Sequence, residues 1–319
     1  MYKSRFPQLE ILNVHEIVAC FLIVFLVMFQ YYMISPKEPY VLTPVKENSV
    51  VIKKVDPFEN ISLSAKAALV WDIKNQKTLY ALNADEPRAL ASLTKVMTAL
   101  TADTLIPYYT VITINNEALK EEGDSGLFGN ERWKLKDLLD FSLLVSSNDG
   151  ARAIAAVAGS VQLGTQEQTL GREGFINTMN QKAKEIGLTQ THFLNENGVD
   201  VGETLGGAYG TATDMAKLFE YILMNHPNLL EATRYKSLTF TSLSNLKHTG
   251  QNTNTKTGEI PGLIASKTGF TDISGGNLVV AFNPELSQPI IVVVLGSTYD
   301  GRFEDVHSLV SATLVYIKQ

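Results

Sequence analysis

The longest apolar stretch of the chain lies near its amino terminus, from Ile17 to Ile34, and contains no charged residue and one glutamine. Such a stretch is just long enough to cross a bilayer core as a helix. The residues that follow Ile34 are Ser-Pro-Lys, without the small-residue pattern that signal peptidases cleave. The pattern therefore predicts that residues 17–34 are an uncleaved transmembrane signal anchor. A buried core helix is the alternative, and the terminal position disfavours it.

The residues on either side of this stretch predict how the chain is oriented. Lys3 and Arg5 precede it, and positive residues favour the cytoplasmic side. Residues 1–16 are therefore expected to be a cytoplasmic tail. Residues 35–60 contain several prolines and no periodic pattern, which is typical of an extracytoplasmic linker. The remaining residues, 61–319, are then expected to form a catalytic domain held outside the cytoplasm by a single-pass anchor in the cell membrane.

Beyond the linker, strand-like and helix-like patterns alternate in a definite order. Residues 65–72 and 77–82 form apolar runs separated by an Asn-Gln turn, which predicts a hairpin. Residues 276–282 and 289–296 are β-branched runs that predict adjacent antiparallel strands. Helical patterns fill the middle and the end of the domain, at residues 91–100, 133–146, 151–158, 175–186, 213–224 and 302–317. This order predicts an α+β fold in which an antiparallel sheet from both ends of the domain packs against a helical cluster.

Composition and charge exclude several functions. The net charge is −6 and no run of Lys or Arg forms a basic stripe, so we do not expect a nucleic-acid partner. The chain has one cysteine, Cys20, and five histidines without metal-ligand spacing. We therefore expect no metal and no other cofactor.

A serine and a lysine are spaced for nucleophilic catalysis in the predicted helix at residues 91–100. Ser92 and Lys95 are three residues apart, so they share one helical face. A lysine in a dry cleft can lose its proton and act as the base for a serine nucleophile. The same spacing recurs at Ser244 and Lys247, so the pair alone is weak evidence of a site.

Two further motifs make the assignment specific. Ser146 and Asn148 follow an apolar helix and offer a hydroxyl and an amide. Lys267-Thr268-Gly269 precedes a buried strand, where an ammonium and a hydroxyl can bind a substrate carboxylate and the glycine lets the substrate approach the strand edge. A second K-T-G triplet begins at Lys256 but leads into a Glu-Ile-Pro-Gly turn, so we expect it to be a loop. The three motifs in this order match the S-x-x-K, S-x-N and K-T-G set of penicillin-interacting enzymes.

From about residue 65 to its end, the chain resembles the low-molecular-mass penicillin-binding proteins, the serine D-alanyl-D-alanine carboxypeptidases of peptidase family S11. The resemblance includes long stretches such as LYALNADEPRALASLTKVMTAL and PGLIASKTGFTDISGGNLVVAF. It implies the β-lactamase/transpeptidase-like fold, a peptidoglycan pentapeptide as substrate, and β-lactams as inhibitors.

The resemblance also implies a role for each motif residue. Ser92 would be acylated by the penultimate D-alanine carbonyl, with Lys95 as base. Ser146 would pass a proton to the leaving D-alanine, and Asn148 would hold the substrate amide. Lys267 and Thr268 would bind the terminal carboxylate. The amides of Ser92 and Phe270 would form the oxyanion hole.

The chain also departs from better-known members of that family. Those members carry a cleaved signal, a second β-domain and a carboxy-terminal anchor, whereas this sequence has the amino-terminal apolar stretch. Ser147 stands at the centre of the second motif, where glycine is more usual, and we expect no loss of chemistry from it.

Three alternatives remain open. A class A β-lactamase would have a deacylating glutamate in an E-x-x-L-N motif, where this chain has Thr191. A D,D-endopeptidase would use the same residues as a carboxypeptidase. A membrane-tethered binding protein without activity is disfavoured because all the motif residues are present.

Overall fold

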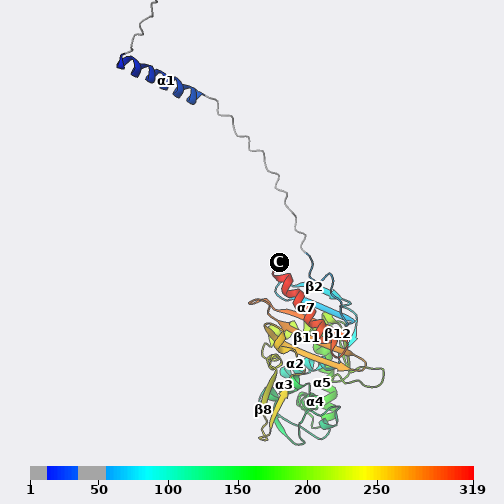
Figure 1. The fold of residues 1–319 in the computed structure, drawn as a ribbon. Helices are drawn as coiled ribbons and strands as arrows, with labels where there is room; N and C mark the ends of the chain where they lie inside the picture. The colour runs from blue at the N-terminus through cyan, green and yellow to red at the C-terminus, as the bar shows by residue number, and fades with distance from the viewer. Residues whose placement is uncertain (1–12, 35–54) are drawn as a thin grey trace, which may run out of the picture. The chain divides into compact units, whose positions relative to one another are not determined.

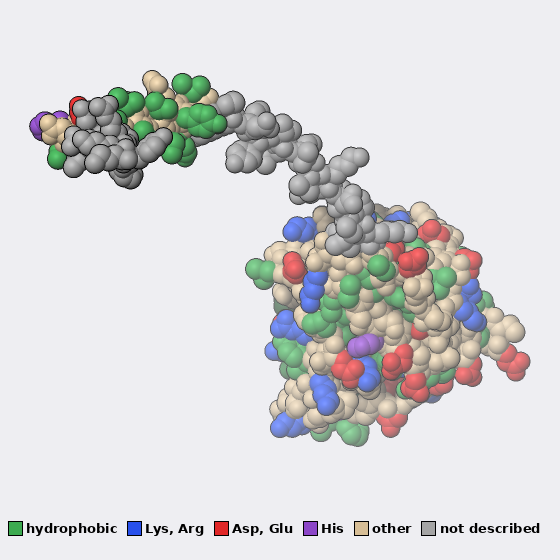
Figure 2. All heavy atoms as spheres, turned by 45° about the horizontal axis from the view of Figure 1, so that its top comes forward, with side chains coloured by type: hydrophobic (Ala, Val, Ile, Leu, Met, Phe, Trp, Pro, Cys, Tyr) green, Lys and Arg blue, Asp and Glu red, His purple; other side chains and the backbone are tan. Residues whose placement is uncertain are grey.

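The computed structural model describes residues 13–34 and 55–319, and the chain divides into two units, residues 1–53 and 54–319. The first unit contains helix α1 (Val14–Ile34), which covers the predicted anchor. Its mean hydropathy of 2.5 and its length suit a membrane span, and its apolar side chains are exposed. Figure 2 shows them crowding the surface of this helix. Most of the expected tail and linker lies outside the described residues.

The second unit is built on an antiparallel five-stranded sheet, which confirms the predicted fold. Its order is β10-β11-β12-β1-β2, so the two ends of the unit meet in one sheet (Figure 1). The strands are β1 (Ala67–Asp72), β2 (Lys77–Leu82), β10 (Leu263–Thr271), β11 (Gly275–Phe282) and β12 (Ile290–Ser297). The predicted hairpin and the predicted pairing of the last two strands are both present.

The central strands are apolar throughout because both faces of the sheet are covered. In β12, Ile291 and Val293 face one core with the helical cluster, while Val292 and Val294 face a second core with helix α7 (Gly301–Ile317). Figure 1 shows α7 on one side of the sheet and α2 to α5 on the other. Burial on both faces explains why this segment reads as a continuous β-branched run rather than an alternating one.

The remaining helices form the cluster that carries the site. They are α2 (Thr94–Leu105), α3 (Leu135–Val145), α4 (Asn148–Leu163), α5 (Gln168–Ile186) and α6 (Ala212–Asn225), with 3-10 turns η1 (Ala91–Leu93), η2 (Ala118–Lys120), η3 (Glu231–Arg234) and η4 (Thr257–Glu259). Small strands complete the unit: β3 (Arg88–Ala89), β4 (Val111–Thr113), β5 (Arg132–Lys134), β6 (His192–Phe193), β7 (Ala208–Gly210), β8 (Ser237–Thr241) and β9 (Lys247–Gln251).

The helix expected at residues 175–186 begins earlier, at Gln168, and two further details of the expected elements were wrong. Trp133 was expected in a helix, but it lies in β5, where it pairs with Ile112 of β4, and α3 begins only at Leu135. The helix expected at residues 151–158 is longer and begins at Asn148, because Ser147 caps its first turn. In both places a local contact fixes the boundary, and apolar periodicity alone does not reveal it.

Candidate active site

The candidate nucleophile lies on a 3-10 turn that leads directly into α2. Ser92 is the central residue of η1, and Ala91 before it has a φ of 48°, in the left-handed region. Non-glycine residues in that region are strained and cluster at functional sites. The expected position of Ser92 at a helix start is confirmed, with a 3-10 turn in place of the first α-helical turn.

Lys95 is buried in the first turn of α2 and points at this serine. Its Nζ lies 2.8 Å from Ser92 Oγ, 2.6 Å from Asn148 Oδ1 and 2.8 Å from the Asn197 carbonyl oxygen. The last two atoms are acceptors only. A neutral amine donates two hydrogen bonds, so its lone pair is left for the Ser92 hydroxyl. Burial lowers the pKa of Lys95 to about 7, although the nearby carboxylates of Glu196 and Glu121 oppose this shift.

The second motif lies at the junction of α3 and α4. Ser146 ends α3 in the left-handed conformation, with a φ of 62°. Ser147 then caps α4, since its Oγ accepts a hydrogen bond from Gly150 N at 2.9 Å. Asn148 begins α4 and reaches Lys95. The hydroxyl of Ser147 is therefore used by the fold, a helix cap that glycine at this position would lack.

The third motif lies inside strand β10, at the edge of the sheet. Lys267 is buried, and its Nζ donates to Ser146 Oγ at 2.8 Å and to the Thr268 carbonyl at 2.9 Å. Burial lowers the pKa of Lys267 well below its ordinary value, and the positive charges of Lys95 and Arg302 lower it further. The two lysines thus reach the second motif from opposite walls: Lys95 contacts Asn148, and Lys267 contacts Ser146.

Two glycines allow the chain to pass close to the nucleophile turn. A Cβ on Gly269 would lie 2.9 Å from the Leu90 carbonyl oxygen and 3.2 Å from Ser92 N. A Cβ on Gly198, which has a φ of 81°, would lie 1.9 Å from the Ala91 carbonyl oxygen. Both close approaches require glycine. Gly269 and Gly198 thus let strand β10 and the loop after Asn197 pack directly against the turn that carries Ser92.

The competing motif copies lie elsewhere. Lys256 precedes η4, and its Nζ pairs with Glu259 at 2.8 Å with the lysine side chain 41% exposed. The Glu259 carboxylate raises the pKa of Lys256. Ser244 and Lys247 are both exposed, and Ser244 lies in the turn between β8 and β9, where its Oγ accepts from Arg132 N. Neither copy lines the cleft that contains Ser92.

Several residues that position the site were not predicted. Asn277 is fully buried, and its Nδ2 donates to the Ala89 carbonyl at 3.0 Å, just before the nucleophile turn. Arg302 of α7 donates to the Gly269 carbonyl at 2.9 Å. Thr253 accepts a hydrogen bond from Thr268 Oγ1 at 2.6 Å. These contacts join backbone carbonyls or distant segments, so no local spacing signals them. The one sign in the sequence was Asn277 itself, a polar residue in an otherwise apolar strand.

The nucleophile opens into a cleft of about 720 Å³. Ser92, Asn148 and Phe270 line it together with the loop from Gly198 to Glu203. Its lining also includes the acidic residues Glu122, Asp200, Glu203 and Asp272. No group of His, Cys, Asp and Glu side chains suited to a metal ion occurs among residues 13–34 and 55–319.

Comparison with known proteins agrees with this geometry. A sequence profile described as D-alanyl-D-alanine carboxypeptidase, peptidase S11, matches residues 53–298. D-alanyl-D-alanine carboxypeptidase DacA of Haemophilus influenzae is 29% identical over 243 residues, which cover 75% of this chain and 59% of that protein. The chain thus spans about three fifths of the length of this relative.

Two further relatives extend the comparison. A D-alanyl-D-alanine endopeptidase of Pseudomonas aeruginosa is 29% identical over 247 residues, which cover 73% of this chain and 71% of that protein. The solved structure of the Streptomyces K15 DD-transpeptidase superimposes with a TM-score of 0.72 at 24% identity, over 80% of this chain and 98% of that one. This last likeness supports the fold.

Proposed function

The chain belongs to the D-alanyl-D-alanine carboxypeptidase family, peptidase S11, and we propose that it is a serine D,D-carboxypeptidase that removes the terminal D-alanine from peptidoglycan stem peptides. The observation that carries this proposal is the buried Lys95 amine, 2.8 Å from Ser92 Oγ at the floor of an open cleft. A serine hydroxyl is a poor nucleophile unless a neighbouring base accepts its proton. Lys95 has the position for that task, and burial lowers its pKa to about 7, so a neutral amine is accessible near neutral pH.

In the first half of the reaction, Ser92 Oγ attacks the carbonyl carbon of the penultimate D-alanine, and its proton passes to Lys95 Nζ. The negative charge that develops on the carbonyl oxygen faces the backbone amides of Ser92 and Phe270. Collapse of this intermediate breaks the peptide bond and leaves an ester on Ser92. The departing amine takes the proton that Lys95 received from Ser92, with the Ser146 hydroxyl as the proposed relay, so Lys95 is neutral again when D-alanine leaves.

The second half restores the enzyme. Water attacks the ester carbon, one proton returns to Ser92 Oγ through Lys95, and the shortened peptide leaves with a new carboxylate. A β-lactam would complete only the first half. When its ring opens, the amine fragment stays attached to the acyl group, so it does not leave and make room for water. We therefore propose β-lactams as covalent inhibitors of Ser92.

Lys267 and Thr268 are the proposed site for the substrate's terminal carboxylate. Without substrate, the pKa of Lys267 is lowered by burial and by the neighbouring cations Lys95 and Arg302. An arriving carboxylate favours the ammonium form and raises that pKa. Because a charge-assisted hydrogen bond is about twice as strong as a neutral one, this site selects peptides that end in a free carboxylate beside the scissile bond.

We further propose that α1 anchors the protein in the cell membrane with the catalytic unit on the extracytoplasmic side. The exposed apolar surface of α1 (Figure 2) supports membrane insertion. Lys3 and Arg5 support the orientation. The substrate of the proposed reaction, peptidoglycan, lies on that same side.

A D,D-endopeptidase is the second candidate, and the Pseudomonas aeruginosa relative favours it, because the chain covers a larger share of that endopeptidase than of DacA. A β-lactamase is disfavoured because Thr191 stands where a deacylating glutamate would be, and its Oγ1 donates to Asp214 Oδ2 at 2.8 Å.

Mass spectrometry of two substrates separates these candidates. The full chain in detergent is incubated with a pentapeptide ending in D-Ala-D-Ala and, separately, with a cross-linked peptide dimer. Loss of one D-alanine from the pentapeptide supports the carboxypeptidase, and cleavage of the dimer alone supports the endopeptidase. Ser92→Ala is the control for both, and activity that survives it would contradict the proposal.

A further inference from the structure

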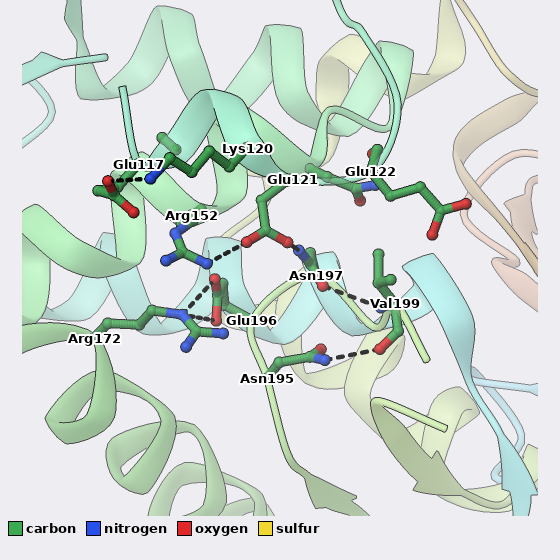
Figure 3. A network of polar contacts seen from close by, with 12 residues as sticks. Glu117, Lys120, Glu121, Glu122, Arg152, Arg172, Asn195, Glu196, Asn197 and Val199 are labelled. Carbon is green, nitrogen blue, oxygen red and sulfur yellow. Dashed lines mark hydrogen bonds and ion pairs between the residues drawn. The ribbon is translucent and has the colours of Figure 1, made fainter. Parts of the chain in front are cut away.

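A cluster of two arginines and two glutamates lies behind the candidate base, and the proposed mechanism does not use it. Figure 3 shows the side chains of Arg152 and Arg172 reaching from two helices toward Glu121 and Glu196. Arg172 Nε donates to both carboxylate oxygens of Glu196, at 2.8 and 2.9 Å. Arg152 Nη1 pairs with Glu121 Oε1. The Glu196 side chain is fully buried.

This cluster is connected to Lys95 through Asn197. The Asn197 carbonyl accepts from Lys95 Nζ at 2.8 Å, while its Nδ2 donates to Glu121 Oε2 at 2.6 Å. Val199 N donates to Asn197 Oδ1 at 3.0 Å and holds the amide from the other side. The neighbouring Glu196 carbonyl accepts from Thr98 Oγ1 at 2.5 Å, one turn along α2 from Lys95. The carboxylates therefore belong to the wall against which the base is packed.

Two carboxylates beside a general-base lysine create a physical conflict. A negative charge near an amine favours the ammonium form, and an ammonium cannot accept the proton of Ser92. Burying a charged pair costs desolvation free energy, which the attraction offsets only when the geometry is good and the remaining hydrogen bonds are made. The arginines lessen the conflict, because each pairs with one carboxylate and so weakens its pull on the Lys95 proton.

We propose that Arg172 and Arg152 are positioning residues for the catalytic base: by pairing with Glu196 and Glu121 they hold the Asn197 carbonyl in place and keep the Lys95 amine neutral. The inference rests on the proposed function only for the assignment of Lys95 as base. It goes beyond that function because neither arginine touches the cleft or the reacting atoms.

The charges that face Lys95 come from every element packed around it. They are Asp149 and Arg152 of α4, Arg172 of α5, Lys267 of β10, Glu121 after η2, and Glu196 before Gly198. Asp149 has its own partner, since its Oδ2 accepts from Ser125 Oγ at 2.8 Å. Lys267 opposes protonation of Lys95. In each of the two arginine–glutamate pairs, replacing the arginine leaves near Lys95 a carboxylate that no longer has a positively charged partner.

The test measures how the rate of acylation depends on pH. The full chain in detergent is treated with a fluorescent penicillin from pH 5.5 to 9.5, and the midpoint of the rise in the second-order rate constant is determined. Arg172→Gln leaves Glu196 unneutralised, so the midpoint is expected to move up by about one pH unit, which is about a fivefold loss of rate at pH 7. Arg152→Gln is expected to move it in the same direction.

The partner substitutions give the opposite sign, which a purely structural role would not produce. Glu196→Gln leaves the Arg172 charge alone, so the midpoint moves down. The double variant Arg172→Gln/Glu196→Gln is expected to return the midpoint to its wild-type value. Arg172→Lys keeps the positive charge and is expected to keep the wild-type midpoint. Arg234→Gln removes an exposed arginine that pairs with Glu231 and is the matched control with no shift.

The midpoint does not depend on how much of the protein is folded, so a variant with low yield still gives a result. A wild-type midpoint in the acylated Arg172→Gln enzyme would overturn this inference and leave the proposed function standing. Failure of the wild-type protein to be acylated at any pH would overturn the proposed function itself.

Discussion

The two K-T-G triplets of this chain have identical sequences and different surroundings. Lys267 lies in strand β10, 2% exposed, with Lys95 and Arg302 as its charged neighbours. Lys256 lies before η4 with its side chain 41% exposed and paired with Glu259. The same amine therefore has a lowered pKa in one triplet and a raised pKa in the other.

The two serine–lysine pairs differ in the same way. Ser92 and Lys95 face a cleft from a 3-10 turn that continues into a buried helix. Ser244 and Lys247 occupy the exposed turn and strand of a hairpin. Spacing thus brings a hydroxyl and an amine into one region, whereas burial and neighbouring charges decide whether the amine can act as a base.

The largest expected difference in acylation rate is between the Lys95→Ala and Lys247→Ala variants. Without its base, Ser92 cannot lose a proton, so the acylation rate is expected to fall about 10²- to 10⁴-fold. Lys247→Ala is expected to leave the rate unchanged. The measurement is the rate of labelled-penicillin binding by each variant, with thermal unfolding as the check on folding. Equal rates in the two variants would remove Lys95 from the mechanism.

Comparison of Lys267→Ala with Lys256→Ala shows which of the two K-T-G triplets binds the substrate carboxylate. Loss of a charge-assisted contact to the substrate carboxylate is expected to lower kcat/KM for pentapeptide about tenfold to a hundredfold. Lys256→Ala removes only a surface ion pair and is expected to have no effect on activity. Steady-state kinetics of D-alanine release decide between them, and a larger loss in the Lys256 variant would reverse the assignment.

Gly269→Ala against Gly258→Ala tests the close approach at the nucleophile turn. A Cβ on Gly269 would lie 2.9 Å from the Leu90 carbonyl oxygen, whereas one on Gly258 meets nothing within 4 Å. Overpacking of this kind costs about 1–3 kcal/mol, so the acylation rate of the Gly269 variant is expected to fall about tenfold. If both variants acylate at the wild-type rate, β10 has more room beside Ser92 than the structure describes.

The smallest expected effect is the change in the acylation rate of the wild-type enzyme with pH. The pKa of Lys95 is lowered to about 7 by burial, and the amine must be neutral to act as base. The acylation rate is therefore expected to rise with pH, reach its half-value near pH 7, and fall about tenfold for each unit well below that value. A rate that still rises steeply above pH 9 would mean that Lys95 is an ordinary, protonated lysine.

Much of the architecture was predictable because its residues have local signatures. The β-branched run at Ile290–Ser297 and the amphipathic helix that ends at Gly187 are examples, and both are present. The choice between Lys267 and Lys256 was also predictable, since Pro261 marks a turn after the second triplet while an apolar strand follows the first.

The parts that could not be predicted depend on backbone atoms or on contacts between distant segments. The Asn197 carbonyl that accepts from Lys95 belongs to a residue 102 positions away, and any residue type offers a carbonyl. Arg302 reaches the Gly269 carbonyl from the last helix. Trp133 was assigned to a helix by its apolar neighbours, but pairing with Ile112 places it in a strand.

Peptide mapping of the penicillin adduct tests the central claim most directly. The full chain is incubated with labelled penicillin, digested, and analysed by mass spectrometry, with Ser92→Ala and Ser244→Ala as the paired variants. If Ser92 is the nucleophile, a single adduct forms on Ser92, and it is present in the Ser244 variant and absent from the Ser92 variant. An adduct on any other residue, or one that survives Ser92→Ala, would contradict it.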